Sequence, residues 1–148
     1  MKKVISQTLL VMCLLPLNCT KTAHNDAEKL KAVVAAYYDG ISNQDRDKMV
    51  SVTTDDFLLY EQGKIWNNDS VFKEMDVAPF KARFSFDGFR IAVDRMSGSM
   101  AYECHAHFIF NDTLRQDFDF VESAAFEKIH GTWKMSFLHV TEKTAPGR

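Results

Sequence analysis

The sequence predicts a single α+β domain in which the helices come early and the strands come late. The chain has 148 residues, which suits one domain and is too short for two of ordinary size. Apolar residues recur at helical spacing between Leu30 and Ile41, and they alternate at every second position from Phe80 onwards. This order predicts helices packed on one face of an antiparallel sheet.

The first 19 residues have the layout of a secretory signal. Two lysines precede an apolar run, Val4 to Leu17, that is shorter than the roughly 20 residues of a membrane span. The sequence Leu15-Pro16-Leu17-Asn18-Cys19 resembles a bacterial lipobox, in which the cysteine is acylated. We therefore expect an exported protein, periplasmic or held at the membrane by lipid on Cys19, with ordinary secretion as the alternative. Residues 20–25 would then be a flexible leader.

Three helices are expected after the leader. The first, residues 26–41, has one apolar face formed by Leu30, Val33, Val34, Tyr37 and Ile41. Asn25 and Glu28 have the spacing of a capping box at its start, and Gly40 lies near its end. A second, shorter helix is predicted near residues 45–52, and a third from residue 68 or 69 to 75.

The strands are predicted from period-two patterns separated by turn residues. A hairpin, residues 57–61 and 64–66, turns at Gln62-Gly63. After Phe80 the expected turns are Asp87-Gly88, Ser97-Gly98, Asn111-Asp112 and His130-Gly131. The domain should span residues 26–142, with a frayed tail at 143–148. A curved antiparallel sheet with three N-terminal-half helices on its concave face would enclose a conical pocket.

Two segments resemble the NTF2-like superfamily. The segment from Tyr37 to Phe57 is similar to the helix–helix–strand opening of these proteins. The segment from Phe126 to Thr141, with Gly131-Thr132-Trp133 and His139, is similar to the ending of the SnoaL-like (DUF4440) branch. The association domain of calcium/calmodulin-dependent kinase II ends in a similar way. The superfamily includes isomerases, cyclases, a dehydratase and many binding or assembly domains, so the fold alone does not define an activity.

The resemblance to ketosteroid isomerases points to two residues. In a gapless comparison Tyr37 takes the place of the phenol donor, and Glu61, 61 − 37 = 24 positions later, that of the proton-shuttling carboxylate. Such an enzyme needs a base and a hydrogen-bond donor in an apolar pocket. The chain departs from that pattern because Gln62 replaces a proline and Ser123 falls near the second donor. The alternative is a core tyrosine and a solvated glutamate.

Glu122 is the one charge on an otherwise apolar strand face, and its position leaves two alternatives. It lies at every second position along the strand, and so on the same face, with Phe118, Phe120, Ala124 and Phe126. A carboxyl group in such a place has a raised pKa unless it is paired. Either Glu122 lines a polar pocket, or a bulge near Ser123 turns it outwards.

Three further features limit the function. The formal net charge of −2 and the lack of basic runs beyond the N-terminus argue against a nucleic-acid partner. Cys104 stands alone in the domain and is expected to be buried. Glu103, His105 and His107 share one strand face, a spacing that suits a metal ion, but the opposite face is wholly apolar. We therefore predict that this face meets solvent or a dimer partner, with no metal and no cofactor.

Three functions remain open. The first is binding of a small apolar or aromatic molecule without chemistry. The second is acid–base catalysis with Glu61 as base and Tyr37 as donor, and the third is a homo-oligomeric assembly module. A homodimer through the sheet face is expected in each case. The expected pocket residues are Tyr60, Trp66, Tyr102, Phe118, Phe120, Glu122 and His139.

Overall fold

The computed structural model of the chain describes residues 19–77 and 80–144. In chain order its elements are α1 (Cys19–Asn43), α2 (Arg46–Ser51), β1 (Thr53–Glu61), β2 (Lys64–Trp66), α3 (Asn68–Val77), β3 (Phe80–Val93), β4 (Ser97–Phe110), β5 (Leu114–Ile129) and β6 (Thr132–Glu142). Residues 1–18 of the predicted signal lie outside the described residues. Within the described part, no helix is long and apolar enough to cross a membrane. The predicted α+β class is confirmed.

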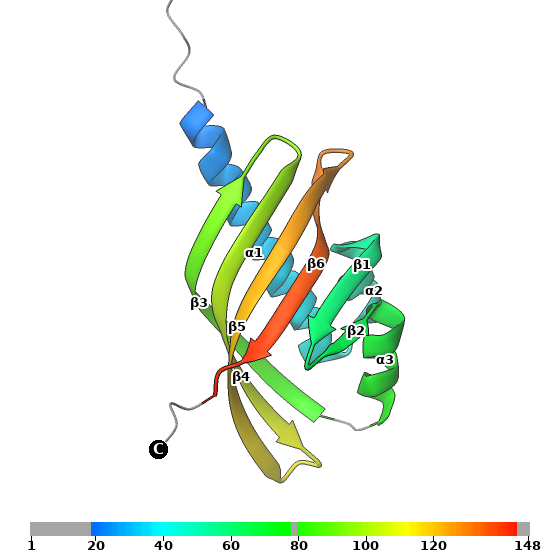
Figure 1. The fold of residues 1–148 in the computed structure, drawn as a ribbon. Coiled ribbons are helices and arrows are strands. Elements are labelled where there is room, and N and C mark those ends of the chain that lie inside the picture. Colours follow the sequence, from blue (N-terminus) through cyan, green and yellow to red (C-terminus); the bar gives the residue numbers. More distant parts are fainter. Residues whose placement is uncertain (1–18, 78–79, 145–148) are drawn as a thin grey trace, which may run out of the picture.

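The six strands form one curved sheet in the order β2-β1-β6-β5-β4-β3 (Figure 1). All neighbouring strands are antiparallel except β1 and β6, which pair in parallel. The prediction of a purely antiparallel sheet is therefore wrong at this one pair. Strand β3 lies at the edge of the sheet farthest from β2. The chain then returns through three antiparallel pairs, β3–β4, β4–β5 and β5–β6, so that β6 lies beside β1 and parallel to it. The result is a mixed sheet.

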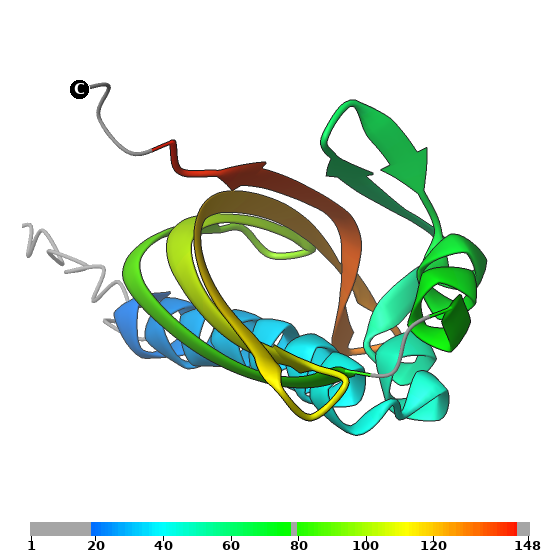
Figure 2. The same cartoon turned by 90° about the horizontal axis from the view of Figure 1, so that it is seen from below.

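Helix α1 lies in the hollow of the sheet, which curls around it (Figure 2). It contacts β3 and β6, whereas α2 contacts β1 and α3 contacts β2. The long helix therefore covers the concave face, and the two short helices pack at the β1–β2 end. The main core lies between α1 and the sheet.

Helix α1 begins earlier than the sequence pattern suggested. It starts at Cys19, so residues 20–25 are helical rather than a flexible leader, and Asn25 lies inside the helix rather than at its cap. No glycine or proline occurs between Cys19 and Gly40, so nothing interrupts the backbone hydrogen bonds. The buried Asp26 accepts bonds from Lys29 Nζ at 2.8 Å and Lys128 Nζ at 2.9 Å. The first ion pair lies within α1, and the second joins α1 to Lys128 on β5.

The junction between α1 and α2 depends on a glycine. A Cβ atom on Gly40 would lie 2.5 Å from Met49 Cγ, a distance that the packed side chain does not allow. Asp45 caps α2 by accepting a hydrogen bond from the Lys48 amide at 3.0 Å. Met49 is fully buried, in agreement with the sequence prediction.

Three boundaries predicted from the sequence are different in the structure. Ser97-Gly98, a predicted turn, lies in β4 and pairs with β5. Asp87-Gly88 is not a turn: β3 runs unbroken through it, with a bulge in its pairing to β4 between Asp87 and Arg90. Gly88 has φ +63°, and both a tight turn and a glycine bulge require such a backbone, so the sequence alone did not distinguish them. The predicted fraying also starts too early, because the Lys143 amide donates to the Asp119 carbonyl at 2.7 Å.

Candidate functional site

A pocket of about 350 Å³ lies between α1, α3 and the concave face of the sheet. Its walls come from every strand and from two helices, so it exists only in the folded domain. The lining residues are Tyr37, Tyr38, Ile41, Leu59, Glu61, Trp66, Val71, Glu74, Met75, Phe80, Phe84, Phe108, Phe110, Phe120, Glu122, Leu138 and Val140. Fourteen of these 17 residues are apolar or aromatic, which is the composition of a small-molecule pocket.

The aromatic walls are packed edge to face. The rings of Tyr38 and Phe84 have centroids 4.7 Å apart, and those of Phe84 and Phe108 are 5.7 Å apart. Phe80 extends this wall, with its centroid 5.5 Å from that of Phe108. These distances lie within the range in which aromatic pairs attract one another. The pocket therefore has a firm apolar wall on the β3–β4 side.

The most buried carboxyl group of the pocket is that of Glu122. It is 1% exposed, and one of its oxygens accepts a hydrogen bond from Tyr38 Oη at 2.6 Å. Burial raises the pKa of the Glu122 carboxyl above its usual value of 4.5, while the facing hydroxyls of Tyr102 and Tyr38 and the thiol of Cys104 oppose the rise. Of the two alternatives from the sequence, Glu122 lines the pocket and is not turned outwards.

The surroundings of Glu122 are polar yet incompletely bonded. Tyr102 pairs with Glu122 across β4 and β5, and both side chains are buried. Within the described residues, Glu122 Oε2 and Tyr102 Oη nevertheless have no partner with hydrogen-bond geometry. Buried polar atoms without partners are rare in folded proteins. Cys104, the predicted buried thiol, is fully buried beside them.

Tyr37 and Glu61, the pair suggested by the isomerase resemblance, both line this pocket. The Tyr37 side chain is fully buried, and its hydroxyl has no partner among the described residues. Burial raises the pKa of Tyr37, and the nearby carboxyls of Glu61 and Glu122 raise it further. Burial also raises the pKa of Glu61, against the opposing charge of Lys64. The pocket thus contains both a phenol hydrogen-bond donor, Tyr37, and a carboxyl group, Glu61, that is protonated more readily than an exposed glutamate.

The β2–α3 side of the pocket adds one more unpartnered donor. Trp66 Nε1 is buried and has no partner among the described residues. The ammonium of Lys64 lies 5.0 Å from the centroid of the Trp66 ring, as expected of a cation–π contact. Glu74, on α3, is an exposed residue at this part of the lining.

The remaining predicted pocket residues lie elsewhere. Tyr60 and His139 are paired neighbours on β1 and β6 and are exposed on the convex face, because they alternate with the inward-facing Leu59 and Leu138. Tyr102 lies beneath the pocket beside Glu122 rather than in its lining. Phe118 stacks on Phe120, with ring centroids 5.9 Å apart, and so supports the wall without lining it.

Comparisons with known proteins identify the fold. No family model matches the sequence, and no curated protein matches it. Among solved structures, an NTF2-like superfamily protein from Salmonella enterica serovar Typhimurium aligns with a TM-score of 0.73 and 14% identity, over 87% of this chain and 96% of that one. The CaMKII association domain of C. elegans aligns with a TM-score of 0.69 and 13% identity, over 82% and 98%. The fold is NTF2-like.

A third structure supports this conclusion. An NTF2-like protein from Cytophaga hutchinsonii aligns with a TM-score of 0.68 and 14% identity, over 79% of this chain and 98% of that one. The predicted NTF2-like fold is thereby confirmed. The SnoaL-like (DUF4440) branch stays a prediction, because such distant likeness shows the fold alone.

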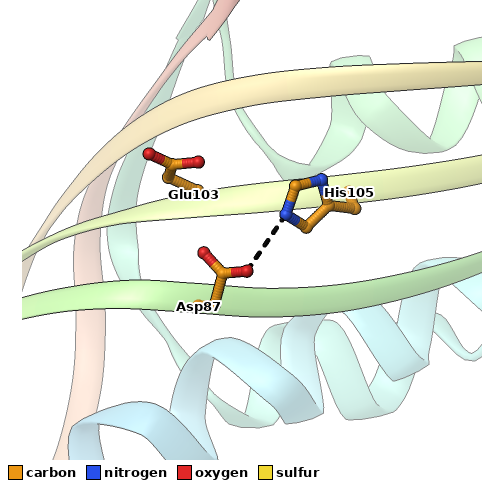
Figure 3. Close-up of side chains that lie close together, drawn as sticks. All are labelled: Asp87, Glu103 and His105. Carbon is orange, nitrogen blue, oxygen red and sulfur yellow. Dashed lines mark hydrogen bonds and ion pairs between the residues drawn. The ribbon is translucent and has the colours of Figure 1, made fainter.

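The convex face of this NTF2-like sheet carries a second cluster of chemical groups. Figure 3 shows Asp87 on β3 beside Glu103 and His105 on β4, with His105 Nε2 3.2 Å from a carboxylate oxygen of Asp87. Among the described residues, these three form the one group whose ligand atoms, all within 4.8 Å of one another, could hold a metal ion. His107 is not part of this group: its Nδ1 lies 2.6 Å from an oxygen of Asp117.

Two residues of this cluster already have partners from the chain itself. His105 Nδ1 lies 2.6 Å from Asp119, and Glu103 forms an ion pair with Lys143. The hydrogen bonds with Asp119 and then Asp87 raise the pKa of His105 above its usual value of 6.5. The predicted solvent-facing orientation of Glu103, His105 and His107 agrees with the alternation of burial along β4. The cluster is therefore a network of exposed ion pairs.

Tyr38 is a pocket residue that the sequence pattern did not indicate. It is the donor to Glu122, yet the apolar face of the first helix was defined through its neighbour Tyr37. Tyr38 follows Val34 by four positions, a spacing that places both on one side of a helix. An apolar helix face drawn to include Tyr38, together with the single charge of Glu122 on an apolar strand face, would have indicated this pair from the sequence.

Proposed function

We propose that this chain is an exported protein whose NTF2-like domain binds a small apolar or aromatic molecule in the concave pocket. The observation that carries the proposal is an apolar pocket lined by buried polar atoms that have no partner among the described residues, namely Tyr37 Oη, Trp66 Nε1 and Glu122 Oε2. Each such atom costs the folded state about 1–3 kcal/mol while it stays unpaired. A ligand that supplies the missing partners recovers this free energy and buries its own apolar surface.

The thermal melting of the protein tests this proposal. Apolar and aromatic fragments of neutral, cationic and anionic type are added one at a time, and a bound fragment raises the melting temperature. Val140→Phe places a larger side chain in the pocket and should remove the rise. Thr141→Phe, the next residue on the exposed face, should keep it. No stabilisation by any fragment, or equal stabilisation of both variants, would contradict binding in this pocket.

Acid–base catalysis is the second candidate, and the convergence of Tyr37 and Glu61 favours it. Glu61 would remove a proton from carbon beside a carbonyl group, and Tyr37 would donate a hydrogen bond to the developing enolate oxygen. The test is the conversion of a β,γ-unsaturated cyclic ketone into its conjugated isomer, followed by ultraviolet absorbance. Turnover should disappear in Glu61→Gln and persist in Glu74→Gln. A wild-type rate equal to that of buffer would contradict this activity.

The convex face supports an additional proposal, a homodimer through the sheet. Leu58, Tyr60 and Val121 are 39%, 37% and 49% exposed on this face, and solved NTF2-like neighbours include association domains. Sedimentation equilibrium should give a dimer for the wild type and a monomer for Val121→Glu. Val77→Glu, on α3, is the control and should stay dimeric. A monomeric wild type would contradict the proposal.

Export and lipid attachment at Cys19 complete the proposal. The predicted signal and lipobox support it, since they precede the start of the folded domain closely. After expression of the full chain in a Gram-negative bacterium, the protein should appear in the membrane fraction, and Cys19→Ser should release it. Equal membrane fractions for both forms would show that no lipid is attached at this residue.

A further inference from the structure

We infer that the ligand of this pocket is an organic cation, a protonated amine or a quaternary ammonium group on a small apolar or aromatic body. The inference rests on the proposed binding function and specifies the chemical class of its ligand. Three independent properties of the pocket lead to it: the sign of its charged groups, the missing partner of its deepest carboxyl group, and its aromatic walls.

The charged groups of the pocket all have one sign. Three of its 17 lining residues are glutamates, Glu61, Glu74 and Glu122, and no described residue in the lining is lysine, arginine or histidine. They come from β1, α3 and β5, so they reach the pocket from different sides. A pocket with carboxyl groups and low-dielectric walls attracts cations and disfavours anions.

Glu122, the most buried of the three carboxyl groups, has no cationic partner among the described residues. The positive charge of Lys64, on β2, stabilises the carboxylate of Glu61. The groups that stabilise the carboxylate of Glu122 are neutral: the hydroxyls of Tyr102 and Tyr38 and the thiol of Cys104. Its Oε2 atom has no hydrogen-bond partner among the described residues although the side chain is 1% exposed. A buried charge is ordinarily paired. A cation placed between Glu122 and Glu61 would supply the pair from the ligand.

The walls suit a cation with an apolar body. Eight of the lining residues are aromatic, and the Phe84, Phe108 and Phe80 rings form one continuous wall. Aromatic faces attract quaternary ammonium and amine groups, and the gain is larger when water is excluded. Lys64, stacked on Trp66, already makes such a contact at the edge of the pocket. A neutral carbonyl ligand could accept bonds from Tyr37 and Trp66 but would leave Glu122 uncompensated.

Two probes of equal shape and different charge test the inference. Benzyltrimethylammonium carries one positive charge, and neopentylbenzene is its neutral carbon isostere. We expect calorimetric titration of the full chain to show the cation binding at least about tenfold more tightly, from its attraction to the carboxyls and the rings. Glu122→Gln keeps an oxygen that can accept the Tyr38 bond and should abolish the preference. Glu127→Gln, an exposed site on the same strand, should retain it.

The outcomes separate this inference from the proposed function. If the neutral probe binds as tightly as the cation, the inference is wrong and the pocket is an apolar binder. If neither probe binds, both proposals fail. Should Glu122→Gln not fold, Glu61→Gln serves as the second variant, because Glu61 is only partly buried. An unchanged cation preference in Glu61→Gln and in Glu122→Gln would also overturn the inference.

The pH dependence gives a second readout. Because the pKa values of Glu122 and Glu61 are raised above 4.5, affinity for the cation should rise with pH as each group ionises above that value, and affinity for the neutral probe should not. The groups that face Glu122 are Tyr37 and Tyr38 from α1, Tyr102 and Cys104 from β4, and Glu61 from β1. The tyrosines and the thiol have raised pKa values and stay neutral as the carboxyls ionise. Cation affinity that is flat or falls with pH would contradict the role of the carboxyls.

Discussion

Glu122 on the concave face of the β4–β5 pair and His105 on its convex face both have raised pKa values, for opposite physical reasons. Burial raises the pKa of Glu122, because a charged carboxylate loses its water. Hydrogen bonds with Asp119 and Asp87 raise the pKa of His105, because carboxylates stabilise the imidazolium. The β4–β5 pair thus carries a buried site, with polar atoms unpaired among the described residues, on its concave face and a solvent-exposed site with ion-paired side chains on its convex face.

This difference is the reason for placing the proposed binding function on the concave face. On the convex face His105, His107 and Glu103 each have a partner from the chain itself, so these groups require nothing more of a ligand. On the concave face Tyr37, Trp66 and Glu122 retain atoms without partners among the described residues. Unsatisfied groups in a buried pocket are sites that a ligand can satisfy. The two faces should therefore respond differently to matched substitutions.

The largest effect is expected when a charge is added to adjacent positions of β5. Ala124 is 3% exposed on the concave face, and Ser123 is exposed on the convex face. Ala124→Asp should lower the free energy of unfolding by about 4 kcal/mol, from a buried carboxyl whose pKa must shift by roughly 3 units. Ser123→Asp should change it by less than about 0.5 kcal/mol. Denaturant unfolding of both variants measures the difference, and equal losses would contradict the assigned faces.

The second prediction compares two tyrosine hydroxyls. Tyr38→Phe removes the donor to Glu122 and leaves that carboxyl with a further unpaired oxygen, so we expect a loss of about 1–3 kcal/mol. Tyr60→Phe, on the exposed face, should change the stability by a few tenths of a kcal/mol at most. Chemical denaturation again measures both. A neutral Tyr38→Phe would show that the hydrogen bond does not hold Glu122.

The helices and most turns followed from the sequence because each depends on local chemistry. Gln62-Gly63 and His130-Gly131 were predicted as hairpin turns, and all four residues have the positive φ that such turns need. The inward face of β5 followed from strict alternation, which placed Glu122 beside Phe120 and Ala124. The α+β class and the curved sheet were therefore predictable from the amino-acid sequence alone.

The features that were missed depend on tertiary contacts. Asp87-Gly88 fits a turn or a bulge equally well, and the choice is made by the unbroken β4 strand opposite it. The parallel pairing of β1 with β6 joins segments far apart in the chain. The orientation of Tyr60 is an exception: it was predicted inwards, although the local alternation with Leu59 and Glu61 already places it on the exposed face. The Tyr38–Glu122 hydrogen bond spans 84 positions, which no local pattern encodes.

The third prediction concerns the pH dependence of stability on the concave side. Because the pKa of Glu122 is higher in the folded state than its usual 4.5, the folded state binds the proton more tightly. The stabilisation is complete below pH 4.5 and is lost as the pH rises through the folded-state pKa. Glu122→Gln lacks this loss, so the variant should gain stability relative to the wild type as the pH rises above 4.5. Parallel pH profiles would contradict a raised pKa.

The smallest effect is expected at His105. Its raised pKa means that its contribution to stability is present below pH 6.5 and is lost as the pH rises through the folded-state pKa. Nuclear magnetic resonance titration should find the pKa of the His105 imidazole above 6.5, and Asp119→Asn should lower it. Asp117→Asn, which removes the partner of His107, is the control and should leave His105 unchanged. A His105 pKa that does not change in Asp119→Asn would contradict the hydrogen bond between these two residues.

Native mass spectrometry of the wild type and Val140→Phe, each purified from the exported fraction, tests most directly whether the concave pocket binds a small molecule. We expect the wild type to carry an organic cation, a protonated amine or a quaternary ammonium compound, in stoichiometric amount. Val140→Phe, with its pocket partly filled, should be free of it. Identical, ligand-free spectra for the two proteins would contradict a binding pocket, and the convex face would become the functional surface to study.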